Sequence, residues 1–210
     1  MIERLRTASN RAVSRETFGK LERYVELVTR EGANQNLIAP AAFDDIWERH
    51  VVDSAQLCRH VEQGVSWLDV GAGAGFPGIV VALITSDPVT MVEPRRLRAD
   101  FLRHCVDELG LAKSQVLSTK VERVSGQFDV ITARAVARLD NLFALTHRLS
   151  HEGTRWVLPK GRSGAIELAE ARESWHGQFS TVPSITDGDS VIVLAERVEP
   201  MGGPRGRARR

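Results

Sequence analysis

A glycine-rich turn is the segment of the sequence best suited to touch a ligand. Its three glycines stand at alternate positions directly after a short apolar run: Gly71, Gly73 and Gly75. Because glycine has no β-carbon, such a turn can take positive φ values and lets a ligand approach the backbone. Pro77 suits the first turn of a following helix, and open α/β sheets bind ligands at such strand-to-helix turns. Residues 73–78 also satisfy the GxGxxG pattern of NAD-binding domains, so the turn alone leaves the cofactor open.

Polar side chains follow other apolar runs at corresponding points. Glu93 lies about twenty residues beyond the glycine turn, where a carboxylate accepts hydrogen bonds from both ribose hydroxyls of adenosylmethionine or NAD. Arg134 follows a later run, and its forked guanidinium can meet a cofactor carboxylate or an RNA backbone. Lys160 ends a further run and can contact guanine O6 or phosphate. We expect all three at the ligand-binding edge of one sheet, although an ordinary surface ion pair is the alternative for Arg134.

Two other pairs of side chains have both a chemical and a structural interpretation. His50 and Asp53 lie one turn apart in an expected helix and could form an acid/base pair. The sequence favours a structural role, since such residues commonly fix a helix to a neighbouring loop. Cys58 and Cys105 have no CxxC or His-rich spacing nearby, so we expect buried thiols, without a disulfide or a metal site.

The elements that must position these residues alternate regularly from Val65 onward, which is typical of a parallel sheet covered on both faces. We expect strands at residues 67–70, 90–93, 115–118, 128–132 and 154–158, with helices at 77–85, 95–109, 138–149 and 164–175. Residues 178–182 and 190–197 flank a turn rich in Pro, Asp and Gly and predict an antiparallel hairpin. The prediction is an α/β class I methyltransferase (Rossmann-like) sheet, since a dinucleotide-binding domain normally keeps its sixth strand parallel.

Three regions follow from the change of pattern along the chain. Residues 1–64 predict a small helical cap, with one helix after Ser14 that ends near Gly32 and a second from Asp44 to Gly64. Residues 65–199 form the ligand-binding core, and residues 200–210 form a basic tail that we expect to be disordered. At 210 residues the chain is long enough for one α/β body with such an appendage.

Charge and hydropathy restrict the function classes. The net charge is +1, but four arginines lie in the tail, so the rest of the chain carries about −3. The folded body therefore lacks a field that gathers nucleic acid, and an RNA substrate must be held by local basic patches. The tail is an RNA-contacting arm or merely a solubilising terminus. The longest apolar stretch, residues 79–84, is far too short to cross a membrane, and we expect a cytoplasmic monomer.

Several ordered motifs together resemble the RsmG (GidB) family, bacterial methyltransferases that modify N7 of a guanine in 16S ribosomal RNA. The resemblance runs from about Asn36 to Gly161. It rests on Arg49-His50, Asp53-Ser54, Leu68-Asp69-Val70-Gly71, Phe76-Pro77-Gly78-Ile79, Arg96, Phe101-Leu102, Val121-Glu122, Phe128-Asp129-Val130, Arg134-Ala135 and Leu158-Pro159-Lys160-Gly161. The sequence departs from many relatives at Pro94, where Ser is usual, and at Lys120, where Arg is frequent.

The resemblance implies roles for particular residues. Gly71 and Phe76 would contact S-adenosyl-L-methionine, Glu93 would bind its ribose, and Val121 and Glu122 would hold its adenine. It further places Arg134 at the cofactor site, and it suggests that His50 and Asp53 buttress the glycine turn. The conformation expected of the turn adds Gly73 to the cofactor residues, while Arg134 and Lys160 would position the substrate.

The implied reaction explains why no catalytic base stands out. N7 of guanine carries a lone pair in the plane of the base and no hydrogen, so its methylation needs alignment of the reacting atoms and no proton removal. The expected partner is 16S ribosomal RNA, free or in a small-subunit assembly particle. Two other classes stay open at this point, an NAD-dependent oxidoreductase and a noncatalytic nucleotide-binding module.

Overall fold

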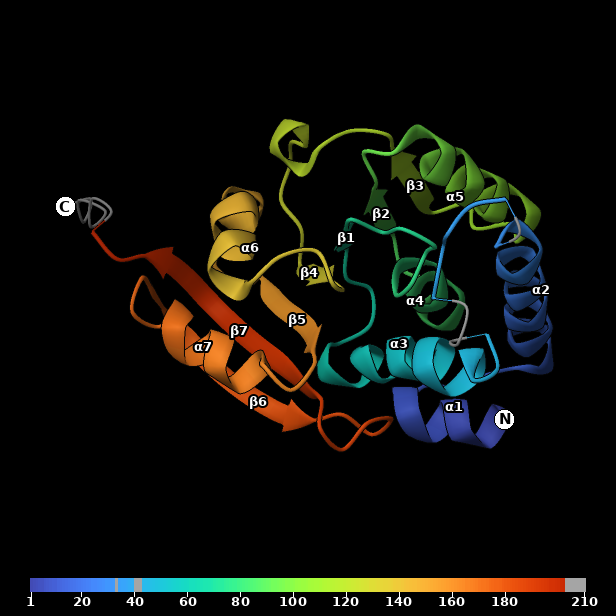
Figure 1. The fold of residues 1–210 in the computed structure, drawn as a ribbon, viewed down its shortest axis with the longest axis horizontal. Coiled ribbons are helices and arrows are strands. Elements are labelled where there is room, and N and C mark those ends of the chain that lie inside the picture. The colour runs from blue at the N-terminus through green and yellow to red at the C-terminus, as the bar shows by residue number, and fades with distance from the viewer. Residues whose placement is uncertain (33, 40–42, 203–210) are drawn as a thin grey trace.

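A single sheet organises the protein. The structure is a computed structural model that describes residues 1–32, 34–39 and 43–202, and within them the chain forms a seven-stranded sheet with helices on both faces (Figure 1). Five strands run parallel: β1 (Trp67–Val70), β2 (Val89–Val92), β3 (Ser114–Leu117), β4 (Val130–Ala133) and β5 (Arg155–Lys160). The order across the sheet is β3-β2-β1-β4-β5-β7-β6.

The last two strands confirm the predicted hairpin. β7 (Val191–Pro200) pairs antiparallel with β5 on one side and with β6 (Trp175–Pro183) on the other. The ladder is longer than expected, because β6 begins at Trp175 and β7 continues to Pro200, and these two residues pair with each other. The parallel sheet closed by this hairpin is the predicted class I arrangement.

Two hydrophobic cores lie on opposite faces of the sheet. One face packs against α4 (Gly78–Thr85) and α5 (Arg96–Glu108), and the other against α6 (Leu139–Thr146) and α7 (Gly164–Ala171). Side chains alternate between these cores along β1, where Trp67 belongs to the first and Leu68 to the second. α4 is apolar on all sides and is buried almost throughout, as its sequence of eight residues requires.

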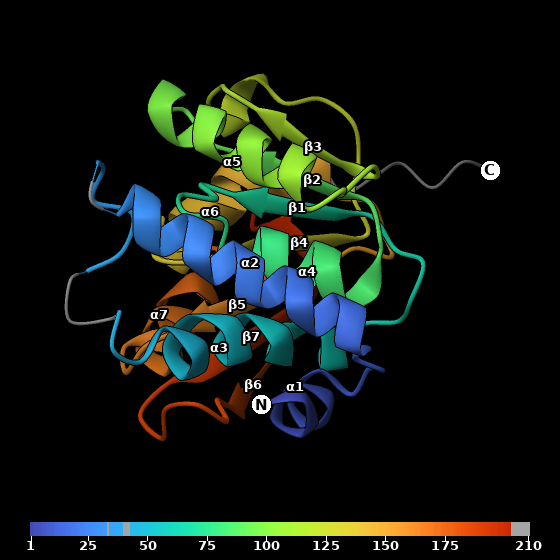
Figure 2. The ribbon, with the colours of Figure 1, turned by 90° about the vertical axis from the view of Figure 1, so that its right-hand side faces the viewer.

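The N-terminal segment packs on the first face of the sheet, on the side of α4 and α5. α2 (Arg15–Glu31) begins as predicted, with the Ser14 hydroxyl accepting the Thr17 amide at 2.9 Å, and Figure 2 shows it crossing α4. α1 (Ile2–Ser9) was not predicted. The second expected helix starts later than Asp44 and is irregular, consisting of a π-helical segment (Trp47–Val52), the short α3 (Asp53–Ala55) and a 3-10 segment (Gln56–His60).

The predicted end of one helix, at residue 175, was wrong. α7 stops at Ala171, and Trp175 begins β6 instead of ending the helix. The Trp175 ring packs against Phe143 at 5.8 Å, and its Nε1 donates to Asp140 Oδ1 at 2.8 Å. Helical spacing alone does not distinguish a buried tryptophan in the last turn from one that opens the next strand.

The hairpin turn joins distant parts of the chain. Gln56 Nε2 donates to Ser184 Oγ at 3.0 Å, and Gln56 Oε1 accepts the Ile185 amide at 2.9 Å. Arg4 Nη2 reaches the Ile185 carbonyl at 3.1 Å. The cap and the hairpin therefore hold each other beside the sheet.

The division of the chain into residues 1–64, 65–199 and 200–210 stays a prediction. Residues 1–64 share the first core with the sheet, where Leu21 and Val28 belong to the same cluster as Ile79. The four tail arginines lie outside the described residues. Among the residues described, no helix is both long and apolar enough to cross a membrane.

Candidate functional site

The glycine turn follows β1 at the carboxyl edge of the sheet, as predicted. φ is +68° at Gly71, +58° at Gly73 and +101° at Gly75, values that a side chain disfavours. The amides of Gly71 and Ala72 both donate to the Val92 carbonyl, at 2.8 and 3.0 Å. A β-carbon on Gly71 would lie 2.6 Å from Val136 Cγ2, so both conformation and space require glycine there.

Glu93 is built into this turn. It follows β2 directly and is only 4% exposed. One carboxylate oxygen accepts the Gly73 amide at 3.0 Å and the other accepts the Arg95 amide at 2.8 Å. Each carboxylate oxygen has two acceptor positions, so each keeps one for a ligand hydroxyl. α5 begins at Arg96, one residue later than expected, after Pro94 and the extended Arg95.

Asp69 supports the turn from within β1; it belongs to one of the family motifs, but the sequence indicated no role for it. Its Oδ2 accepts the Gly78 amide at 2.9 Å, at the start of α4, and Oδ1 has no partner within the described part of the chain. Burial raises the pKa of Asp69 to about 7. An acidic residue inside a four-residue buried strand is the signal that could have identified it.

Phe76 is only 4% exposed and is enclosed by side chains of the cap. Its ring lies 5.0 Å from the Tyr24 ring and stacks on His50 at 5.0 Å, with 24° between the planes. Tyr24 Oη also donates to the Ala74 carbonyl at 2.8 Å. Burial, followed by the nearby Arg134, lowers the pKa of His50 to about 4. A neutral imidazole stacked on Phe76 thus joins the helix of His50 to the glycine turn.

Arg134 follows β4 and faces the same edge. Its guanidinium lies 5.4 Å from the centre of the Phe76 ring, and Nη1 stands 3.6 Å from Asp53 Oδ2. Asp53 also accepts from Gln56 and Thr186. Asp53 therefore pins the cap to the β4 end and to the hairpin, the structural role that its position in the helix suggested.

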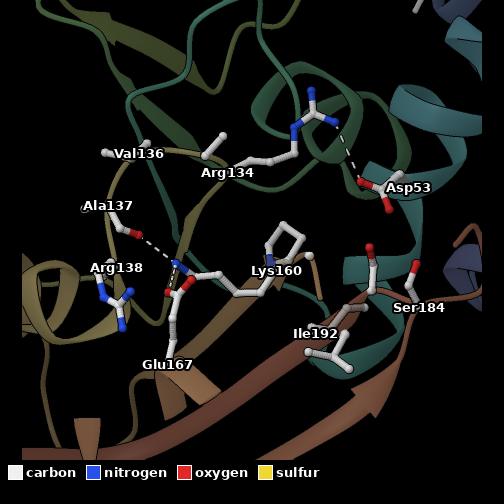
Figure 3. A pocket seen from close by; sticks show the side chains of 14 residues that line it. Asp53, Arg134, Val136, Ala137, Arg138, Lys160, Glu167, Ser184 and Ile192 are labelled. Carbon is white, nitrogen blue, oxygen red and sulfur yellow. Dashed lines mark hydrogen bonds and ion pairs between the residues drawn. The ribbon is translucent and has the colours of Figure 1, made fainter. Parts of the chain in front are cut away.

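A cavity of about 450 Å³ opens beside Arg134, and we name it the edge pocket (Figure 3). Its walls come from the ends of β4 and β5, the hairpin and α3: Asp53, Arg134, Ala135, Val136, Ala137, Arg138, Pro159, Lys160, Gly161, Glu167, Ser184, Ser190, Val191 and Ile192. Lys160 lines the edge pocket, but its ammonium group is already hydrogen-bonded within the protein. Its Nζ donates to the Ala137 carbonyl at 2.6 Å and to Glu167 Oε2 at 2.9 Å.

The predicted adenine residues form a 3-10 turn, Val121–Arg123, a few residues after β3. Val121 is buried and Glu122 is exposed. Arg148, in the 3-10 turn His147–Leu149 that follows α6, donates to the carbonyls of Val121 and Val124 at 2.6 and 2.7 Å and so holds the two turns together. The Val121–Arg123 turn lies at the same edge of the sheet as the glycine turn and Glu93.

The thiols and the remaining acidic and imidazole groups add no second centre. Cys58 and Cys105 are buried and unpaired as expected, and burial raises the pKa of each to about 12. Over the described ranges, His, Cys, Asp and Glu form no group that could hold a metal ion. The edge with the glycine turn thus combines a backbone ligand site with the edge pocket.

Comparisons with known proteins agree with this geometry. The model of the GidB family, described as rRNA small subunit methyltransferase G, matches residues 17–192. Ribosomal RNA small subunit methyltransferase G of Rhizorhabdus wittichii is 48% identical over 201 residues, with 93% of each chain covered. The protein of the same name from Zymomonas mobilis is 41% identical over 198 residues, covering 90% of this chain and 89% of that one.

A solved structure supports the fold. Ribosomal protein L11 methylase from Lactobacillus delbrueckii superimposes with a TM-score of 0.58 at 17% identity, covering 71% of this chain and 78% of that chain. The extent of the family match then favours a methyltransferase over an NAD-dependent oxidoreductase or a noncatalytic module. This chain belongs to the GidB family, rRNA small subunit methyltransferase G.

Proposed function

We propose that this protein transfers a methyl group from S-adenosylmethionine to N7 of a guanine in 16S ribosomal RNA. The observation that carries the proposal is the contact between two sites at one sheet edge. Val136 packs over Gly71 of the glycine turn and also lines the edge pocket. A ligand on the turn and a base in the pocket would therefore be neighbours.

The residues at the turn fit S-adenosylmethionine. Glu93 keeps an acceptor position on each oxygen for a ribose hydroxyl, and Gly71 and Gly73 let the backbone approach the ligand. Val121 and Glu122 would hold the adenine. When bound, S-adenosylmethionine supplies an activated methyl group on its sulfonium. Phe76, although expected to touch the cofactor, is enclosed by the cap, so we assign it to holding the turn in place.

The edge pocket suits an acceptor that needs no deprotonation. Its two acidic side chains, Asp53 and Glu167, are already paired with Arg134 and Lys160. N7 of guanine has a lone pair and no hydrogen. What the chain must do is hold the base in line at near-contact distance, which is itself a large source of rate enhancement.

The surface around the pocket suits RNA. Exposed basic side chains follow the ends of β2, β3, β4 and β5: Arg95, Arg96, Lys120, Arg123, Arg138 and Arg162. Arg96, Arg138 and Arg162 are ion-paired with Asp100, Glu170 and Asp189, respectively. The others offer local contacts to phosphates in a body whose overall charge does not attract nucleic acid.

Methylation in vitro tests the proposal. The protein is incubated with labelled S-adenosylmethionine and unmodified 16S ribosomal RNA, and the label is mapped to a nucleotide. Chain cleavage there after borohydride and aniline treatment identifies N7-methylguanine. Label on a base that resists this treatment would place the methyl group on another atom. Absence of label from both free RNA and small-subunit particles would contradict the proposal.

Two further proposals concern the form in which the RNA is methylated and the oligomeric state of the enzyme. We favour RNA within a small-subunit assembly particle, because folded RNA can present a guanine in a loop or distorted segment. Parallel reactions with free RNA and with small-subunit particles compare the two. Sedimentation of the enzyme during the same experiment tests the expected monomer.

A further inference from the structure

The segment between β4 and α6 separates the glycine turn from the edge pocket. We name residues 135–138 the linker segment. Ala135 has a φ of +56°, which costs a residue with a β-carbon free energy. Val136 is 41% exposed and leans over Gly71. The position of this segment therefore sets the spacing between the two ligand sites.

Two charged side chains hold the segment from the other side (Figure 3). Lys160 Nζ bonds the Ala137 carbonyl and Glu167 Oε2. The same Glu167 oxygen accepts the amide of Leu139, the first residue of α6, at 3.2 Å, and Oε1 accepts from Ser163 Oγ at 2.8 Å. One carboxylate thus links β5, α6 and α7.

The pair is enclosed. The side chains of Lys160 and Glu167 are only 11% and 10% exposed. A β-carbon on Gly164 would lie 2.7 Å from Lys160 Cβ, so the lysine stem packs directly on the start of α7. Burying a Lys–Glu pair is costly unless its hydrogen bonds are made, and here both groups bond defined partners.

We propose that Glu167 is a positioning residue, which with Lys160 clamps the linker segment at the distance that aligns acceptor and methyl donor. The inference rests on the proposed function. It also changes the expected role of Lys160, whose main task becomes holding Ala137. Because a displacement of about 1 Å at a reacting centre can cost about a hundredfold in rate, a loose segment would slow transfer even with both ligands bound.

The first test is Glu167→Gln. This variant keeps an oxygen for Leu139 but loses the charge that holds Lys160. We expect kcat to fall by about tenfold to a hundredfold, with KM for RNA and the Kd of S-adenosylmethionine unchanged. Glu173→Gln, an exposed residue just after α7, removes the same charge and should keep the wild-type kcat. A wild-type kcat in Glu167→Gln, or a loss of cofactor affinity, would overturn the clamp.

A double variant separates the clamp from a direct RNA contact. If Lys160 and Glu167 act as a unit, Lys160→Met/Glu167→Gln should be no slower than the slower single variant. Losses that multiply, with a raised KM for RNA in Lys160→Met, would show that Lys160 binds RNA independently. If Glu167→Gln does not fold, Glu167→Asp keeps the charge but falls short of Lys160, and should show the same kcat loss.

Hydrogen exchange provides a readout independent of methyl transfer. Glu167→Ala removes the acceptor of the Leu139 amide, which should then exchange faster than in the wild type, while the amides of β1 should not change. Unchanged exchange at Leu139 would overturn the clamp. If wild-type protein fails to methylate RNA yet Leu139 exchange rises in this variant, the proposed function is wrong, and the bond that holds the start of α6 stands without a role in transfer.

Discussion

The two halves of the carboxyl edge are built in different ways. The cofactor half, comprising the glycine turn and Glu93, is held by backbone amides that bond the Val92 carbonyl and a buried carboxylate. The acceptor half, comprising Arg134, Lys160 and the linker segment, is held by ion pairs to side chains from other elements. Changes in the first half should therefore alter cofactor affinity, and changes in the second should alter transfer.

The largest effect is expected for Gly71→Val. The substitution places a branched side chain at a φ of +68° and against Val136, where S-adenosylmethionine must approach. Its affinity should fall by at least about a hundredfold, or roughly 3 kcal/mol, as measured by calorimetry. Gly19→Ala is the matched control, since a β-carbon there meets nothing within 4 Å. Unchanged affinity in a folded Gly71→Val protein would remove the turn from the cofactor site.

Arg134 tests the boundary between the halves. Arg134→Ala removes the partner of Asp53 and the cation over Phe76, and should lower the single-turnover rate about tenfold to a hundredfold, as loss of a charged hydrogen-bonding group does. Arg134→Lys should restore little of the single-turnover rate if the planar guanidinium matters, and most of it if only the charge matters. Cofactor affinity measured in parallel assigns the loss to binding or to alignment. Wild-type behaviour of both variants would contradict any role at the site.

The two halves should also respond differently to pH. The pKa of Asp69 is raised to about 7 by burial, so between its ordinary pKa and 7 the folded state keeps a proton that the unfolded chain releases. Stability should therefore fall by roughly 1 kcal/mol for each pH unit from about pH 4 to about pH 7, and level off above that. In Asp69→Asn this decrease should disappear from urea unfolding curves. Persistence of the same slope in the variant would assign it to another group.

The pKa of Glu167 is shifted in the opposite direction from that of Asp69, so its effect on stability has the opposite dependence on pH. Burial opposes its ionisation, but hydrogen bonds from Lys160 and Ser163 outweigh burial and lower its pKa below the ordinary value. Its contribution to stability is therefore present above the ordinary pKa and lost as pH falls through the folded value. Glu167→Gln should flatten the acid limb of the stability curve and leave the decrease caused by Asp69 intact.

The smallest effect concerns the basic tail, whose arginines lie outside the described residues. If it binds RNA, deletion after Pro200 should weaken RNA binding and reduce the slope of log K against log salt by about 0.7 to 0.9 for each phosphate that the tail neutralises. The affinity for S-adenosylmethionine should stay the same. An equal slope in the full-length and truncated proteins would favour a solubilising terminus.

The cofactor half was largely predictable because its signals are local. Gly71 and Glu93 each follow an apolar run directly, and a parallel sheet brings such positions to one edge. The sequence also placed Arg134 at that edge. The sequence could not indicate that Lys160 is ion-paired with Glu167, since that contact depends on how α7 packs against β5. Nor could it identify Tyr24, which bonds Ala74 from fifty residues away.

The bond between the hairpin turn and the cap sets an order of events during synthesis. Gln56 and Ser184 are 128 positions apart, so this bond forms only after Ser184 has left the ribosome. By then every residue of the glycine turn and Glu93 has long been available. Ser184, Ser190 and Ile192 complete the wall of the edge pocket, and they emerge after the wall residues of β4, β5 and α7. A chain that stopped before Ser184 would carry a ligand-binding turn beside an open wall, so closure of the pocket waits for the hairpin.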